Sequence, residues 1–251
     1  MEVNRKGLKA EIKKPDYNFI KEWSKDFYKD EANRIKDIVL KEYIENHMGN
    51  TDIDNVLMKV TLINSFYNTF IQNDELVSVA QHIVRLNELL ENAGKSLDEK
   101  IKDGDSDTVN FIAYYSETKK LPHNIYSFAS KYCSFHNQKK FPIVDSYSKG
   151  MIYFINKSDT YCSEYKNTSI NSLNDYEVFC KLYKAFQETY AKDKDNNTLS
   201  FKEIDQYLWF YATEKAKNDD EFKKLIRIED TEKPKSLEIK IENLSNKDRR
   251  I

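Results

Sequence analysis

The stretch from Leu121 to Tyr147 reads LPHNIYSFASKYCSFHNQKKFPIVDSY, and its first acidic residue is Asp145. Apolar and aromatic residues recur at helical spacing between Ile125 and His136, which predicts a helix there. The apolar run Phe-Pro-Ile-Val then leads into Asp145, and a second helix is predicted from Ser146 to Phe154. The stretch therefore predicts two consecutive helices joined by a connection that contains two lysines.

Residues 118–144 contain no Asp or Glu, although 42 of the 251 residues of the chain are acidic. Lysines that meet phosphates, interleaved with rings that can stack on bases, are typical of a nucleic-acid-binding surface. A solvated lysine face over a helical core is the alternative interpretation of the same pattern. The residues that we expect to contact DNA are Lys119, Lys120, His123, Ser127, Lys139 and Lys140.

Lys131 and Asp145 are the candidate catalytic residues of this stretch. Small residues precede Lys131, and the apolar run before Asp145 predicts that this carboxylate lies at the edge of a core. A lysine in a partly buried site becomes a better nucleophile, because loss of water disfavours its charged form. A nearby carboxylate can accept a proton or stabilise developing positive charge on a sugar.

Four segments together resemble the helix-hairpin-helix DNA glycosylases, and most closely a bacterial 8-oxoguanine-glycosylase-like family. They are Ser127–Asn137 with Lys131, Phe141–Tyr147 with its Pro-Ile-Val-Asp sequence, Leu62–Thr69 and Phe201–Trp209. The resemblance implies that Lys131 attacks the sugar C1′ to give a Schiff base, while Asp145 assists the nucleophile and the oxocarbenium-like centre. Ser127 and Ala129 stand where the family has its hairpin glycines, so the resemblance does not define how DNA is gripped.

The reaction that this resemblance implies requires base flipping, because C1′ cannot be attacked in a stacked duplex. A flipped base needs an apolar or aromatic pocket, and a core role is the alternative for each ring that could line it. The candidates are Phe135, Phe141 and Tyr147, with Asn64 as the residue that could contact the orphan base or simply make ordinary helix-surface hydrogen bonds.

Elsewhere the 3.6-residue apolar rhythm predicts a mostly helical, all-α protein. The resemblance implies that its helices form a two-lobed fold of the helix-hairpin-helix glycosylase type. We expect a mobile basic arm over residues 1–14, a helical domain over 15–230 and a charged, partly disordered tail over 231–251. A minor strand is expected near Leu237–Ile241. One long helix is predicted to start near Asp52, with apolar residues as far as Ile71.

The composition argues against several other classes of protein. Forty basic residues nearly balance the acidic ones, which argues against coating of nucleic acid through bulk charge. The three cysteines and four histidines form no zinc-type motif, so we expect no metal and no cofactor. Without an apolar leader or spanning run, we expect a cytoplasmic, nucleoid-associated monomer with no membrane partner.

The function predicted from the sequence is thus a DNA glycosylase with abasic-site lyase activity. Its expected partner is double-stranded DNA that carries an oxidised or modified base. Two alternatives remain open at this point: a non-catalytic DNA-binding protein on a degenerate glycosylase scaffold, and a helical protein-interaction module.

Overall fold

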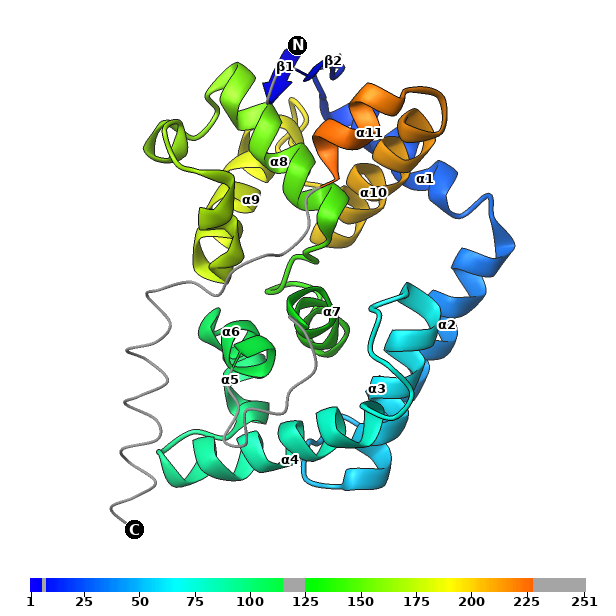
Figure 1. Ribbon diagram of the computed structural model, residues 1–251, viewed down its shortest axis with the longest axis vertical. Helices are drawn as coiled ribbons and strands as arrows, with labels where there is room; N and C mark the ends of the chain where they lie inside the picture. Colours follow the sequence, from blue (N-terminus) through cyan, green and yellow to red (C-terminus); the bar gives the residue numbers. More distant parts are fainter. Residues whose placement is uncertain (6–7, 115–124, 228–251) are drawn as a thin grey trace. The chain divides into compact units, whose positions relative to one another are not determined.

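The computed structural model describes residues 1–5, 8–114 and 125–227, and the chain divides into two compact units (Figure 1). Among the described residues, unit 1 combines Met1–Arg34 with residues 142–227, and unit 2 is Ile35–Phe141. The described residues are mostly helical, which confirms the fold class predicted from the sequence. No helix among them is long and apolar enough to cross a membrane.

Unit 1 is built on helices that pack around a core rich in aromatic rings. Its elements are β1 (Glu2–Arg5), β2 (Leu8–Glu11), α1 (Tyr17–Phe27), α8 (Ser146–Asp159), α9 (Tyr176–Tyr190), α10 (Phe201–Asn218) and α11 (Asp220–Ile226), with 3-10 helices at Ser163–Tyr165 and Ile170–Asn174. Helix α1 packs along α10, where the Trp23 ring meets Tyr211 edge to face at 5.1 Å between centroids. Gly150 lets α8 pass close to α11, because a Cβ there would lie 1.9 Å from the Ile226 carbonyl oxygen.

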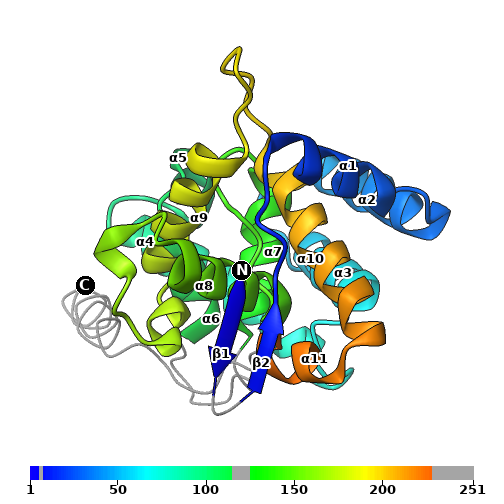
Figure 2. The same cartoon turned by 90° about the horizontal axis from the view of Figure 1, so that it is seen from above.

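The first residues of the chain differ from the mobile arm expected there. Strands β1 and β2 pair antiparallel, with Glu2 opposite Glu11, and β2 contacts α11 while β1 contacts α8 (Figure 2). Ala10 and Ile12 are buried, whereas Lys9 and Glu11 are exposed. This alternation places one face of the segment on the core of unit 1, which anchors it.

Unit 2 is a group of helices, and α7 is among the most completely buried of them. Its helices are α2 (Glu31–Asn46, with its first turn in the range of unit 1), α3 (Ile53–Tyr67), α4 (Leu76–Asn92), α5 (Leu97–Asp103), α6 (Asp107–Tyr114) and α7 (Tyr126–His136). Helix α3 packs against α4 and α7, and α7 packs against α6. Leu86, Leu90 and Val60 are among the apolar residues buried in this core.

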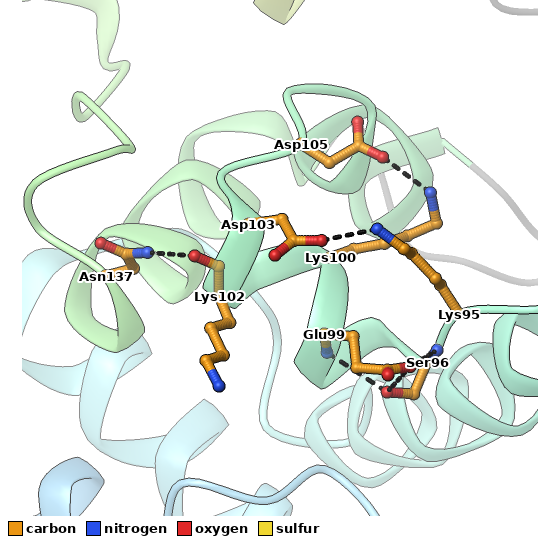
Figure 3. Close-up of polar contacts among 8 residues, drawn as sticks. All are labelled: Lys95, Ser96, Glu99, Lys100, Lys102, Asp103, Asp105 and Asn137. Atoms are coloured by element: carbon orange, nitrogen blue, oxygen red, sulfur yellow. Dashed lines mark hydrogen bonds and ion pairs between the residues drawn. The ribbon is translucent and has the colours of Figure 1, made fainter.

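The ends of these helices follow local sequence signals. Asp52 caps α3, with its carboxylate accepting from two backbone N–H groups. Ser96 and Glu99 form a capping box at the start of α5, and Gly104 ends that helix in the left-handed conformation (Figure 3). The salt bridges Lys95–Asp103 and Lys100–Asp105 flank the same short helix (Figure 3).

The helix predicted to run from Asp52 towards Ile71 is shorter than expected. Helix α3 ends at Tyr67, because Asn68 takes a left-handed conformation with φ of 46° and the chain leaves the helix there. Ile71 is still buried, but it reaches the core from a loop. The strand expected near Leu237–Ile241 lies outside the described residues.

Candidate active site around Lys131

Lys131 lies on a buried face of α7. Every residue of this helix from Phe128 to Phe135 is buried, and Lys131 itself is only 5% exposed. Its Nζ donates a hydrogen bond of 2.7 Å to the Oγ of Ser127, one turn earlier on the same helix. The ammonium is therefore held in a largely water-free position by a neighbouring hydroxyl.

The C-terminal end of α7 is tied to α5. The side-chain amide of Asn137 donates to the carbonyl oxygens of Ile101 at 3.0 Å and Lys102 at 3.1 Å, the latter drawn in Figure 3. These carbonyls lie in the last turn of α5, where helical backbone acceptors lack partners within the helix. Satisfying them from Asn137 fixes the end of the helix that carries Lys131.

Asp145, in unit 1, is the N-cap of α8. Its Oδ1 accepts from the backbone N–H of Tyr147 at 2.9 Å and of Ser148 at 2.7 Å, and the Ser148 hydroxyl accepts from the Asp145 N–H at 2.9 Å. The three residues before Asp145 are buried, as their apolar character predicts. The carboxylate therefore lies at the edge of the unit 1 core with a well-defined capping role.

Two groups of unit 1 define the surroundings of Asp145. The Tyr176 hydroxyl donates to the Pro142 carbonyl at 2.7 Å and so holds the segment that leads into the cap. Burial raises the pKa of Tyr183 well above its usual value, and the negative charges of Asp205 and Asp145 raise it further. Burial, with Asp205 and Asp145 adding to its effect, thus keeps the Tyr183 hydroxyl protonated.

A second buried lysine of unit 2, Lys59 on α3, was not singled out by the sequence analysis. Its side chain is completely buried, and its Nζ lies 2.9 Å from the Gly49 carbonyl, 3.0 Å from Asn50 Oδ1 and 3.1 Å from His136 Nε2. An ammonium has three N–H donors, and these three acceptors account for all of them. Lys59 therefore links the α2–α3 loop to the end of α7.

The partners of Lys59 extend this network through unit 2. Asn50 donates its side-chain amide to Asp98 Oδ1 at 2.6 Å, and its Oδ1 also accepts from the Tyr132 hydroxyl. Burial lowers the pKa of Lys59 to about 8, while Asp98 and Asp52 oppose that shift. The side-chain amide of Asn50 thus links the buried Lys59 ammonium to the Asp98 carboxylate.

His136 completes the network as a neutral ring. Burial, and next the charge of Lys59, lower the pKa of His136 to about 3. Its Nδ1 lies 2.7 Å from the Tyr132 carbonyl oxygen, so it carries the ring proton and leaves Nε2 free to accept from Lys59. This residue of the acid-free stretch therefore serves the core of unit 2 as an uncharged acceptor.

A signal for Lys59 does exist in the sequence. It lies three residues after Val56 and four before Ile63, which places a lysine within the apolar stripe of α3. A charged residue on the inward face of a helix needs buried acceptors. The identity of those acceptors depends on tertiary contacts that span the chain from Gly49 to His136.

The residues expected to contact DNA fall into three groups. Lys119, Lys120 and His123 lie outside the described residues. Lys139 and Lys140 are exposed in the turn after α7, and the alkyl stem of Lys140 covers Gly104, where an added Cβ would lie 2.8 Å from it. Ser127 is half-buried and accepts the hydrogen bond of Lys131.

The residues expected to line a base pocket belong to both units. Phe135 and Phe141 of unit 2 are buried, and Tyr147 of unit 1 is half-buried behind the Asp145 cap. Phe135 packs against Tyr67 with 5.3 Å between ring centroids. Asn64 makes its hydrogen bonds to the loop after α3, which agrees with the ordinary structural role weighed for it.

Within residues 1–5, 8–114 and 125–227, no group of three or more His, Cys, Asp or Glu side chains is placed to hold a metal ion.

The sequence was also compared with known proteins. It is 32% identical over 186 residues to a protein of Haemophilus influenzae described as "Uncharacterized protein", and the match covers 72% of this chain and 80% of that protein. The chain belongs to the family of this Haemophilus protein. The family model HI_0787_N, described as an N-terminal domain, matches residues 17–140, a range that includes Lys131 and ends before Asp145. No solved structure gives a significant match to this family member.

Proposed function

We propose that the protein is a DNA glycosylase with abasic-site lyase activity, which removes an oxidised or modified base through a Schiff base on Lys131. The observation that carries the proposal is the position of this amine, buried on α7 and bonded to a hydroxyl of its own helix. The order of residues around it, which resembles the 8-oxoguanine-glycosylase-like family, supports the same chemistry.

In the proposed reaction, the neutral Lys131 amine forms a bond from Nζ to C1′ of the flipped nucleotide. The bond from C1′ to the base breaks, and the base leaves with the electron pair and takes up a proton. The ring oxygen then leaves C1′ as a hydroxyl, which gives a Schiff base between Nζ and C1′. Loss of a C2′ proton from this species expels the 3′ phosphate, which is the lyase step.

Asp145 is proposed as the carboxylate that accepts the amine proton and stabilises positive charge on the sugar. Its position as the N-cap of α8 supports this role, because the cap hydrogen bonds fix the orientation of the carboxylate. Only one of its two oxygens accepts those two backbone bonds. The exposed Lys139 and Lys140 are proposed to contact the phosphates.

Borohydride trapping tests the nucleophile. The reagent reduces a Schiff base to a stable amine, so the protein becomes covalently bound to a duplex that carries 8-oxoguanine or an abasic site. We expect an adduct with the wild type and none with Lys131→Met. The matched control is Lys149→Met, which removes another buried lysine, bonded at 3.0 Å to Asn174 Oδ1, and should keep the adduct. A missing wild-type adduct, or an adduct with Lys131→Met, would contradict the proposal.

Two substitutions separate the charge of Asp145 from its capping role. Asparagine caps helices about as well as aspartate, so Asp145→Asn should leave stability and DNA affinity nearly unchanged while turnover falls at least about 100-fold. Asp145→Ala should lose turnover and about 0.5–2 kcal/mol of stability as well. Equal loss of affinity and turnover in Asp145→Asn would indicate a purely structural residue.

The two alternatives each have an observation in their favour. The low exposure of Lys131 and the capping role of Asp145 also suit a DNA-binding protein that has no catalytic activity. It would show salt-sensitive binding without an adduct and no dependence on the Asp145 charge. The half-exposed Ile35, Ile38 and Val39 on α2 favour a protein-interaction module, which would bind DNA weakly at any salt concentration.

A further inference from the structure

The loop between α3 and α4 presents an aromatic ring to solvent. Phe70 is 75% exposed, whereas the other exposed large hydrophobic residues of the described chain are 38% to 49% exposed. Its backbone has φ of 61°, in the left-handed region. Such a conformation is rare for a bulky side chain without a special role, and exposing a whole ring forfeits its burial. Phe70 therefore combines an unfavourable backbone conformation with an unfavourable exposure of its ring.

The loop is held so that Phe70 cannot simply turn inward. Asn64 Oδ1 accepts from the Thr69 hydroxyl at 2.8 Å and from the Ile71 N–H at 3.1 Å, and Asn64 Nδ2 donates to the Ile71 carbonyl at 2.8 Å. Ile71 itself is buried. The residues on both sides of Phe70 are thus hydrogen-bonded to the side-chain amide of Asn64 on α3. These bonds fix the backbone conformation in which the Phe70 ring points to solvent.

The same loop begins beside the face of α7 that carries Lys131. Phe135 follows Lys131 by four residues, so the two side chains are neighbours on one face of the helix, about 6 Å apart. Phe135 packs against Tyr67, the last residue of α3, and Phe70 follows three residues later. All of these residues belong to unit 2, so the exposed ring and the proposed nucleophile share one local framework.

We propose that Phe70 is a wedge that enters the base stack of duplex DNA and occupies the space left by the nucleotide that Lys131 attacks. This inference rests on the proposed function and deepens it by naming the residue that opens the duplex. Proteins that unstack DNA insert apolar side chains between bases, and an aromatic ring can stack on any base. Residues 68–73 carry no charge, and the two carboxylates of the loop, those of Asp74 and Glu75, lie at its far end before α4.

The choice of DNA over a protein partner follows from the surroundings of the ring. A protein-binding hot spot is the centre of a larger packed patch, whereas the neighbours of Phe70 in the loop are the polar Asn68, Thr69, Gln72 and Asn73. Glu75, at the far end, is turned back to accept from the Gln72 N–H. The single Phe70 ring, surrounded in the loop by polar residues, is better suited to insertion into a base stack than to docking in an apolar groove.

The test uses a duplex with 2-aminopurine at the target position, because this base becomes more fluorescent when it is unstacked. We expect the wild type to raise the fluorescence on binding, Phe70→Ala to lose at least about 80% of that rise, and Phe70→Trp to keep it. Met58→Ala, which removes an exposed apolar side chain from α3 itself, is the matched control and should behave as the wild type. An equal rise with Phe70→Ala, or none with the wild type, would overturn the wedge.

A second arm keeps this result separate from the fate of the proposed function. In borohydride trapping on the 8-oxoguanine duplex, Phe70→Ala should react about tenfold or more slowly, within the range for loss of one stacking ring. On a single strand that carries an abasic site, there is no duplex to open, so the variant should react at the wild-type rate. Equal losses on both substrates would overturn the wedge. A wild-type fluorescence rise without any adduct would overturn catalysis and leave the wedge standing.

Discussion

Two buried lysines of unit 2, on helices that pack against one another, differ in what their ammonium groups bind. Lys59 on α3 contacts acceptors of three residues from two other parts of the chain, and so joins the α2–α3 loop to the end of α7. The contact of Lys131 with Ser127 joins two residues of the same helix. Burial by itself therefore does not identify a catalytic lysine. A lysine whose acceptors lie on separate segments, as those of Lys59 do, is expected to stabilise the fold.

The largest expected effect on stability comes from Lys59→Met. Removing the cation takes one donor each from the Gly49 carbonyl, Asn50 Oδ1 and His136 Nε2, and it leaves Asp98 without its nearby positive charge. The free energy of unfolding should therefore fall by about 3–5 kcal/mol. Urea denaturation followed by circular dichroism measures the change. Lys41→Met, at an exposed lysine that pairs with Glu45 on α2, should change it by less than about 0.5 kcal/mol. A loss as small for Lys59→Met would show that the network contributes little to the fold.

Acid should destabilise the protein through two histidines of unit 2, one of which contacts Lys59. Burial lowers the pKa of His136 to about 3 and that of His82 to about 4, against an ordinary value of 6.5. Between those values the unfolded chain binds protons that the folded chain does not. The contribution of these two histidines to stability should therefore be steady above pH 6.5 and fall as the pH is lowered towards 4 and 3, by at most about 1.4 kcal/mol per pH unit for each histidine.

Urea midpoints measured at pH 7, 5.5 and 4.5 follow this loss. His136→Gln removes one of the two titrating rings, so its stability should depend less steeply on pH than that of the wild type. An unchanged slope in this variant would show that His136 does not titrate with folding, and the account of a neutral acceptor beside Lys59 would then be wrong.

The smallest expected effect concerns Lys139, an exposed lysine in the turn after α7. Lys139→Ala should weaken DNA binding similarly for modified and unmodified duplexes, and it should reduce the slope of log K against log salt by about 1. Fluorescence anisotropy at several salt concentrations measures this slope. Lys41→Met serves again as the control. An unchanged slope would show that Lys139 does not contact the phosphates, and other residues would then have to bind them.

Much of the helical architecture could be predicted, because it depends on local signals. The apolar rhythm located α7, and the apolar lead-in to Asp145 located both a helix start and a core edge. The early end of α3 could not be predicted, since the apolar letters continue to Ile71 and only the left-handed Asn68 takes the chain out of the helix.

The candidate site was predictable in part for the same reason. Lys131 was found from its neighbours in the sequence, and its burial on α7 agrees with the expectation of a partly buried amine. The network of Lys59 joins Asn50 to His136, and no local pattern gives such long-range partners. Phe70 was missed because one aromatic residue in a loop looks ordinary until its exposure and its positive φ are known.

Mapping the site of the trapped adduct tests the central claim most directly. The borohydride-reduced complex of the wild type with an 8-oxoguanine duplex is digested with nuclease and protease, and the modified peptide is sequenced by mass spectrometry. The account predicts a reduced sugar fragment on Nζ of Lys131 and an unmodified Lys59. An adduct on Lys59 or on any other amine, or no adduct in a protein that binds the duplex, would contradict it.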